Sequence, residues 1–320
     1  GRVVLVDRDD GTQTGVDGVP AVDAAGQGGL LDVAVHPEFP ADPWLYLTYS
    51  ATTANGDSST HLGRGRLDPD AAALRGFEVL HRAEPFLDRN NHYGSRVVFG
   101  ADGLVYMSVG DRQFKNFGSN HVAQDRSNDL GTILRFEPDG SVPDDNPFVD
   151  SDERTSSGSR APPDDDPNAR DGIYSYGHRN PQGLTVHPET GALWEAEHGE
   201  RDGDELNVIE AGGNYGWPVA THACRYGTDR PVGDSPDERD EMVAPVYYWE
   251  CGSGGFPPSG ITFYDGPVDD WRGDLFVGNL AGTYLGRFTV DGTDVTEREP
   301  LLADWGWRVR AVETAPETGH

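Results

Sequence analysis

His92 and Asp111 have the residue types and the spacing of a catalytic base with its partner. His92 lies in NHYGSR (91–96), directly before an apolar run, and Asp111 follows 19 residues later at the end of RVVFGADGLVYMSVGD (96–111). If this segment forms two strands joined by a turn, the chain returns and the carboxylate meets the imidazole. A histidine that is oriented and kept basic by a carboxylate is the usual arrangement of a general base. The alternative is an exposed histidine without a catalytic role.

The run GHRNPQG (177–183) gathers hydrogen-bond donors in a chain that is otherwise rich in carboxylates. Pro181 restricts the backbone, and the flanking glycines allow close approach. Arg179 offers a planar fork, while Asn180 and Gln182 add directional amide hydrogen bonds. We expect these donors to face an electron-rich partner. The run alone is consistent with a structural carboxylate, a phosphate or a quinone-like cofactor.

Two further segments have the composition of binding sites. EHGERDGDELN (197–207) and GGNYGWP (212–218) place many oxygen atoms beside glycines, which suits the six to eight oxygen ligands of calcium. The spacing of an EF-hand is absent, and a solvated acidic loop is the alternative. Near the end of the chain, Arg308 and Arg310 flank Val309, so in an extended segment both point to the same side.

The elements that must position these residues follow an irregular repeat. An apolar run, a turn with Pro, Asp, Glu or Gly, and a second apolar run recur along the chain, and alternation within the runs predicts half-buried strands paired as hairpins. No convincing helix is found. Radial repetition of such units predicts an all-β, six-bladed β-propeller formed as one domain by residues 1–320, whereas a β-sandwich would show shorter and more even spacing. The ends look trimmed, because the terminal blade lacks strands. The hairpins are expected at 30–50, 96–111, 184–199 and 260–280, with a fifth beginning at 309.

Composition excludes some classes of partner. The net charge is −30, with 25 basic residues of which only Lys115 is a lysine. This charge argues against nucleic acid and anionic membranes, and it suggests adaptation to high salt or an acidic secreted protein. No signal peptide or membrane span is visible. Cys224 and Cys251 either form a disulfide, which requires an oxidising compartment, or remain free thiols.

Taken together, these motifs resemble a known family. The chain is similar to the soluble pyrroloquinoline quinone (PQQ)-dependent sugar dehydrogenases, the glucose/sorbosone dehydrogenase family, and within it to the aldose sugar dehydrogenases. HRNPQG combined with GDELN and GGNYGWP is the most specific part of the resemblance. The other matching blocks are GQGGLLDVAVHPEF, NHYGSRVVFGADGLVYMSVGD, LGTILRFEPDGSVPDDNPF, IYSYG, LTVHP, PSGITFY and RVRAV.

The resemblance implies a propeller with PQQ over its axial mouth, held by calcium. His92 matches the base that takes the proton of the anomeric hydroxyl while a hydride passes from C1 to the quinone. Asp111 would stabilise the resulting imidazolium, and Arg179 would face the quinone oxygen. The remaining implied cofactor contacts are Gln27, Asn180, Gln182, His198, Arg308 and Arg310. The implied calcium ligands are Gly199 and Glu200 for the cofactor's ion, and Glu205 and Tyr215 for a second, structural ion.

Two departures from the family pattern stand out. Ala281 and Gly282 occupy the place of a lysine that the family commonly has over the quinone, and Arg287 is a candidate substitute. His198 stands where glucose-specific relatives carry glutamine, so the preferred aldose is left open.

The expected activity is oxidation of aldoses to lactones by an extracellular or periplasm-type monomer or homodimer, with an external electron acceptor. A calcium-dependent propeller hydrolase of the lactonase or phosphotriesterase kind is one alternative, which requires side-chain carboxylates and amides converging on the metal. A non-enzymatic carbohydrate-binding propeller is the other, and it has no need of His92 with Asp111 and Arg179.

Overall fold

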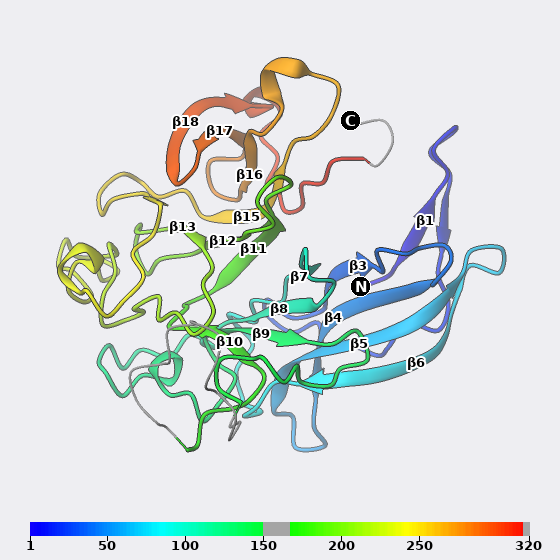
Figure 1. Ribbon diagram of the computed structural model, residues 1–320, viewed down its shortest axis with the longest axis horizontal. Coiled ribbons are helices and arrows are strands. Elements are labelled where there is room, and N and C mark those ends of the chain that lie inside the picture. Colours follow the sequence, from blue (N-terminus) through cyan, green and yellow to red (C-terminus); the bar gives the residue numbers. More distant parts are fainter. Residues whose placement is uncertain (150–166, 316–320) are drawn as a thin grey trace.

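The computed structural model describes residues 1–149 and 167–315 (Figure 1). The described chain forms one two-stranded and four four-stranded antiparallel sheets, each built from strands consecutive in sequence. The two-stranded sheet pairs β1 (Val4–Val6) with β2 (Gln13–Gly15). The first four-stranded sheet contains β3 (Leu30–Val35), β4 (Trp44–Thr52), β5 (Ser58–Asp68) and β6 (Ala73–Arg82). The second contains β7 (Val97–Phe99), β8 (Val105–Val109), β9 (Thr132–Phe136) and β10 (Ile173–Tyr176).

The other two sheets follow the same order. The third contains β11 (Pro181–Val186), β12 (Leu193–Glu197), β13 (Glu205–Val208) and β14 (Tyr247–Tyr248). The fourth contains β15 (Pro258–Phe263), β16 (Leu275–Asn279), β17 (Leu285–Asp291) and β18 (Asp294–Leu301). The helices of the described residues are single 3₁₀ turns: Val122–Gln124, Pro236–Glu238, Asp269–Trp271 and Ala303–Trp305. No helix in these parts of the chain is long and apolar enough to cross a membrane.

The prediction of an all-β chain of repeated hairpins is therefore confirmed. The four expected hairpins are β3–β4, β7–β8, β11–β12 and β15–β16, each the first two strands of a four-stranded sheet. In Figure 1 the sheets follow one another around an arc, with the first strand of each on the inside. Contacts join β3 to β7, β7 to β11 and β11 to β15. This is the arrangement of successive propeller blades. The count of six blades stays a prediction.

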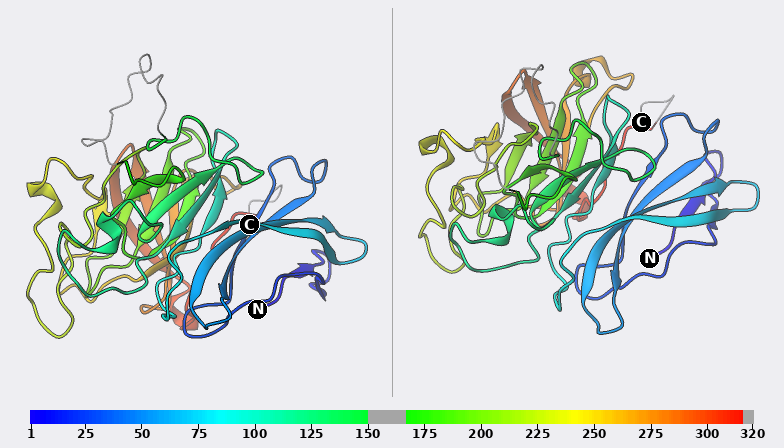
Figure 2. Two further views of the ribbon diagram at one scale, coloured as in Figure 1. Left: turned by 90° about the horizontal axis from the view of Figure 1, so that it is seen from below. Right: turned by 60° about the horizontal axis from the view of Figure 1, so that its bottom comes forward.

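The core lies between neighbouring sheets. Tyr46 and Leu62 of the first sheet pack with Met107 and Leu134 of the second, and similar clusters join the second to the third and the third to the fourth. Because the inner sheets are covered on both faces, β8, β9, β12 and β16 are buried along their whole length. The N-terminal β1–β2 hairpin lies beside the β3–β6 sheet (Figure 2).

The segment after β18 returns to the inside of the arc. Gly260 N–H donates to Arg310 O over 2.9 Å, so residues 309–311 run beside β15. A Cβ on Gly260 would lie 2.8 Å from Ala311 Cα, and glycine is therefore required for this approach. The fifth predicted hairpin, which begins at 309, is not formed in the described residues, because 309–315 contain no strand. Residues 316–320 lie outside the described part of the chain.

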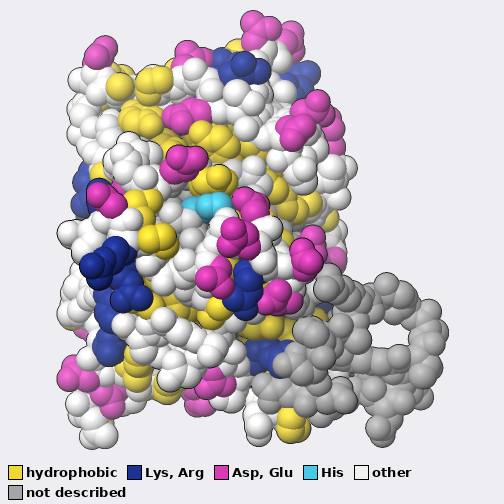
Figure 3. Space-filling model, turned by 90° about the vertical axis from the view of Figure 1, so that its left-hand side faces the viewer, with side chains coloured by type: hydrophobic (Ala, Val, Ile, Leu, Met, Phe, Trp, Pro, Cys, Tyr) yellow, Lys and Arg dark blue, Asp and Glu magenta, His cyan; other side chains and the backbone are white. Residues whose placement is uncertain are grey.

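Acidic side chains are spread over the surface, as the composition predicts. Figure 3 shows one face, on which Asp and Glu side chains are scattered and Lys and Arg side chains gather in a few places.

Candidate active site

The β7–β8 hairpin brings His92 and Asp111 together, as predicted from their spacing. His92 Nδ1 lies 2.7 Å from Asp111 Oδ1, and both side chains are buried. A Cβ on Gly110 would lie 2.4 Å from His92 O, so glycine in VGD allows the two ends of the hairpin to touch. The His92 backbone N–H donates to Gln27 Oε1 over 2.8 Å, which joins the loop before β3 to the same site.

Burial and the surrounding charges shift the pKa of both members of this pair downward. Burial lowers the pKa of His92, its hydrogen bond to Asp111 opposes this shift, and the positive charge of Arg179 adds to it. Burial raises the pKa of Asp111, but its hydrogen bond with His92 and the charge of Arg179 outweigh burial, and the net shift is downward. His92 therefore donates its Nδ1–H to Asp111. Within residues 1–149 and 167–315, Nε2 has no hydrogen-bond partner, and its lone pair is available for a proton.

Glu197 organises the GHRNPQG turn between β10 and β11. Its Oε2 accepts from the backbone N–H of Arg179 at 2.6 Å and of Asn180 at 3.3 Å. Its Oε1 lies 3.3 Å from His178 Nδ1. The turn therefore rests on a structural carboxylate through its backbone and His178, while the side chains of Asn180 and Gln182 remain directed to a pocket.

A pocket of about 640 Å³ opens inside the arc of sheets. Its lining contains six of the seven predicted cofactor contacts: Gln27, Asn180, Gln182, His198, Arg308 and Arg310. The other lining residues are Gly26, Gly28, Leu30, Leu31, Tyr93, Gly94, Ser95, Arg96, Ser259 and Leu280. Among these residues there is no Asp or Glu, although the chain contains 55 of them. The charged side chains of the lining are therefore Arg96, Arg308 and Arg310, all of them positive.

Arg96 was not identified from the sequence, although it lies at the end of the quoted NHYGSR. Its Nε donates to Gln182 O over 2.5 Å, NH1 to Asp32 Oδ1 over 3.2 Å, and NH2 to Arg310 O over 2.5 Å. Arg96 thus ties β3, β11 and the C-terminal segment together at the pocket wall.

Arg179 does not line this pocket, in contrast to the prediction. Its NH1 donates to His198 O over 3.0 Å and its NH2 to Glu200 Oε2 over 2.8 Å, so the guanidinium turns toward a smaller neighbouring cavity. Arg179 Nε is buried without a partner in the described parts of the chain. Lys115 also donates to Glu200, at 2.6 Å from Oε1. The only lysine of the chain therefore shares a carboxylate with Arg179.

The four predicted calcium ligands lie in the same region. Gly199, Glu205 and Tyr215 line the smaller cavity, whereas the side chain of Glu200 is occupied by Arg179 and Lys115. The Tyr215 hydroxyl donates to Val208 O over 2.6 Å, which leaves its backbone oxygen as the candidate ligand atom. Burial, together with the nearby charge of Glu197, raises the pKa of Glu205, which is the environment that a bound cation would relieve.

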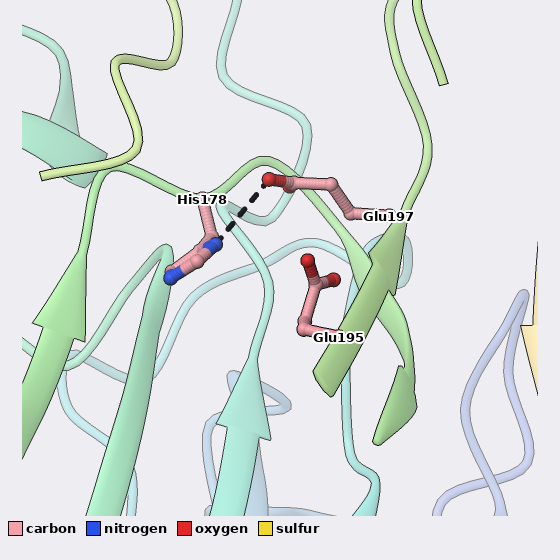
Figure 4. A group of neighbouring side chains, drawn as sticks. All are labelled: His178, Glu195 and Glu197. Carbon is pink, nitrogen blue, oxygen red and sulfur yellow. Dashed lines mark hydrogen bonds and ion pairs between the residues drawn. The ribbon is translucent and has the colours of Figure 1, made fainter. Parts of the chain in front are cut away.

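A second buried acidic group lies below the turn. His178, Glu195 and Glu197 offer ligand atoms within 4.8 Å of one another (Figure 4). Both ring nitrogens of His178 already have partners, Glu197 Oε1 and Ser175 Oγ at 2.9 Å. Glu195 Oε2 accepts from Asn207 over 3.0 Å, while Glu195 Oε1 has no partner in the described chain. Sequence patterns did not identify this cluster, because Glu195 and Glu197 fit the alternation of polar and apolar residues in an ordinary strand.

The chain is similar to known proteins along its whole length. The family model for Glucose / Sorbosone dehydrogenase matches residues 1–320. This chain belongs to the glucose/sorbosone dehydrogenase family. Aldose sugar dehydrogenase YliI of Escherichia coli is 36% identical over 312 residues, which are 96% of this chain and 77% of that protein.

Solved structures of this family have the same fold. A crystal structure of a glucose dehydrogenase is 38% identical, with a TM-score of 0.86 over 99% of this chain and 85% of that one. The PQQ-bound aldose sugar dehydrogenase of Streptomyces coelicolor is 28% identical, with a TM-score of 0.74 over 97% of this chain and 78% of that one.

Two questions left open by the sequence are settled within this family fold. Cys224 and Cys251 form a disulfide, with their Cα atoms 5.6 Å apart. Arg287 does not replace the family lysine. Its Nε donates to Asp274 over 2.6 Å and its NH1 to Glu299 over 2.5 Å, on the outer part of the fourth sheet and away from the pocket lining. The ion pairs with these two carboxylates hold the guanidinium there.

Proposed function

We propose that this chain is a PQQ- and calcium-dependent dehydrogenase that oxidises aldose sugars at C1 to lactones. The observation that carries the proposal is the pocket itself. In a chain of net charge −30, its lining contains arginines and amides without an Asp or Glu, and Tyr93, the residue directly after His92, belongs to that lining. Such a pocket suits a flat anionic quinone and a neutral sugar better than a bare metal ion.

The donors of the pocket fit the carboxylates and carbonyl oxygens of PQQ. Arg308 and Arg310 supply charge, and Gln27, Asn180 and Gln182 supply amide hydrogen bonds. When bound, PQQ supplies the acceptor for the hydride of the substrate. Arg179, whose Nε is buried without a partner among the described residues, supplies positive charge beside this pocket and supports negative charge that develops there.

His92 is the proposed general base. Its free Nε2 accepts the proton of the anomeric hydroxyl, while Asp111 holds Nδ1–H and stabilises the imidazolium that forms. Because burial keeps the imidazole neutral, the base is ready at neutral pH without a prior loss of a proton.

Calcium is proposed at two places beside the pocket. The carbonyl oxygens of Gly199 and Glu200 are the candidate ligands for the ion that holds the cofactor. Glu205 and the carbonyl oxygen of Tyr215 are the candidates for a structural ion. In residues 1–149 and 167–315 no donor occupies these three carbonyl oxygens, and Glu205 adds a buried carboxylate, so the groups are oxygen ligands of the kind that calcium prefers.

The alternatives are less consistent with the site. A calcium-dependent hydrolase needs carboxylate ligands converging in its pocket, and the lining offers none. A carbohydrate-binding propeller has no use for a buried histidine whose free nitrogen is backed by an ionised carboxylate.

Other features of the whole protein are proposed on weaker support. The matched length and the order of the sheets support one six-bladed propeller domain over residues 1–320. The disulfide supports an extracellular or periplasm-type location. Electrons pass to an external acceptor, the protein acts as a monomer or homodimer, and the acidic surface suits high salt.

Reconstitution tests the proposed function. The full-length chain is incubated with PQQ and calcium, and reduction of a redox dye is followed with several aldoses, with and without a calcium chelator. We expect dye reduction that requires PQQ, calcium and sugar together. Lactone hydrolysis without PQQ, or no dye reduction in a protein that binds PQQ, would contradict the proposal.

A further inference from the structure

Trp217 contacts both groups that surround the proposed base. Its indole Nε1–H donates to Asp111 Oδ2 over 2.8 Å. The guanidinium carbon of Arg179 lies 5.3 Å from the centre of its ring, within the range of a cation–π contact. The side chain is 3% exposed, so these contacts are made away from water. One buried residue thus joins Asp111, which orients His92, to the arginine beside the pocket.

The backbone holds the indole in place. The Trp217 N–H donates to Gly177 O over 2.8 Å, and Trp217 O accepts from Gln124 Nε2 over 2.8 Å. Phe117 and His121 pack edge-on against the ring, with centroids 5.6 Å and 6.0 Å away. A side chain fixed in this way acts on its partners without first paying an entropic cost of ordering.

Trp217 Nε1–H makes the short hydrogen bond to Asp111 Oδ2, the carboxylate oxygen that is not bonded to His92. His121 Nε2 is the other nitrogen near Oδ2, at 3.5 Å, beyond the range of a good hydrogen bond. His121 Nδ1 accepts from Ala123 N–H, so its proton sits on Nε2, which donates to Phe114 O over 3.4 Å. Asp111 Oδ1 accepts from His92 Nδ1–H and from the Gln113 backbone N–H, each over 2.7 Å.

We propose that Trp217 is a positioning residue that limits the basicity of His92 through Asp111 and braces the guanidinium of Arg179. A carboxylate that shares its charge with a second donor stabilises a neighbouring imidazolium less strongly. Trp217, together with the backbone N–H of Gln113, therefore takes up part of the negative charge of Asp111, and Trp217 is the side chain that does so.

Several other charged or titratable groups face His92. They are Asp111 after β8, Lys115 in the loop that follows it, His121 before the Val122–Gln124 turn, Arg179 before β11, and His198 after β12. Arg179 and Lys115 lower the pKa of His92, whereas Asp111 raises it. Of these groups, Asp111, Arg179 and His121 contact Trp217, and only Asp111 is hydrogen-bonded to His92.

Trp217→Phe tests the proposal, because it keeps an aromatic ring under Arg179 and removes only the N–H donor. The pKa of His92 is measured by NMR of the full-length, histidine-labelled chain. We expect it to rise by about 0.5–1 unit, the size of effect expected from one hydrogen bond to its partner. In the PQQ- and calcium-loaded protein, the acid limb of the kcat/KM profile moves to higher pH by the same amount, so kcat/KM below the midpoint falls about 3- to 10-fold.

Trp271→Phe is the matched control. Its ring carries the guanidinium of Arg287 at 5.6 Å, a similar contact in the fourth sheet, remote from His92. We expect this variant to leave the His92 pKa and the kinetic profile unchanged. An unchanged His92 pKa in a folded Trp217→Phe, or an equal shift in Trp271→Phe, overturns the proposal.

A second measurement covers the case in which Trp217→Phe does not fold. In the unmutated chain, one of the seven tryptophan indole N–H signals must move with the midpoint of the His92 titration. His92→Gln must abolish that movement. If no indole signal follows His92, the proposal is wrong. The kinetic measurement rests on the proposed function, whereas the two NMR measurements do not depend on it. A failure of this proposal can therefore be distinguished from a failure of the proposed function.

Discussion

At the scale of single residues, the proposed chemistry depends on one free nitrogen. Asp111 occupies Nδ1 of His92, and the backbone of His92 is held by Gln27, so Nε2 is the atom left for a proton. Arg179 and Lys115 surround Glu200 and leave this corner of the site with an excess of positive charge. The positive charge of Arg179 and Lys115 favours the neutral form of the base.

His92→Gln is expected to lower kcat by about 10²–10⁴-fold, the range for loss of a general base. PQQ binding should be retained, because His92 is not among the residues that line the pocket. Steady-state dye reduction and a PQQ titration measure the two effects. His187→Gln, in the β11–β12 turn, is the control, since its Nδ1 accepts from the local N–H groups of Glu189 and Thr190. Unchanged kcat in His92→Gln would refute the role of the base.

Sequence reasoning identified residues that lie in dense motifs and missed those that act across the fold. His92 and Asp111 were accessible because a hairpin converts spacing into proximity. Trp217 meets Asp111 from 106 residues away, and no local pattern records that contact. The direction of Arg179 was also invisible, because Glu200 and a backbone carbonyl determine it.

At the scale of elements, the β12–β13 ladder concentrates buried carboxylates. Glu197 pairs with Glu205 and Glu195 with Asn207 in the register of the two strands, so all four side chains share one face. Burial and the charge of Glu197 raise the pKa of Glu195 well above its ordinary value. The folded protein therefore binds a proton at Glu195 that the unfolded chain releases.

Glu195→Gln is expected to stabilise the protein increasingly as pH rises. Below the ordinary pKa of 4.5, Glu195 is protonated in both the folded and the unfolded unmutated protein, and the acid and the amide are equivalent. As pH rises through the raised folded pKa, the unmutated protein loses the stability that depends on this proton, whereas the Gln variant does not. The gain should grow by about 1.4 kcal/mol per pH unit between these two values. Denaturant unfolding between pH 4 and 8 measures it.

Glu189→Gln, in the exposed β11–β12 turn, is the control for this slope. A Glu195→Gln variant whose gain is the same at every pH would show that Glu195 is ionised in the folded state.

The disulfide fastens the loop that carries the candidate calcium ligands. Arg201 and Cys224 exchange backbone hydrogen bonds at 3.0 and 3.1 Å, and Cys224 is bonded to Cys251, 27 residues away. The double variant Cys224→Ser/Cys251→Ser should lose roughly 3–4 kcal/mol of unfolding free energy in the chain-entropy model. Chemical denaturation measures the loss, and the unmutated protein under reducing conditions is the control. Equal stability of the oxidised protein and the double variant would contradict the prediction.

At the scale of the whole molecule, charge is segregated between the surface and the pocket. The surface carries the net charge of −30, while the pocket lining is free of acidic side chains. The composition and the alternating runs were sufficient to predict this surface and the repeated antiparallel sheets. They did not determine the number of blades, because closure depends on contacts between the first and last parts of the ring.

The unfolding temperature should rise between about 0.05 and 0.5 M KCl, because salt screens the repulsion between surface carboxylates. Thermal unfolding at pH 7 measures the effect, and sucrose at matched osmolality controls for general solvent exclusion. An unfolding temperature that is independent of salt would contradict adaptation to high ionic strength.

The most direct test of the central claim is a single-turnover measurement on the full-length protein loaded with PQQ and calcium. One equivalent of aldose is added without a dye, and the absorbance of the oxidised quinone is followed for the unmutated protein and His92→Gln. We predict rapid loss of the oxidised quinone with lactone formation in the unmutated protein, and loss slowed by at least about 100-fold in the variant. Stoichiometric PQQ binding without any reduction by aldoses, or equal rates in the two proteins, would contradict the account.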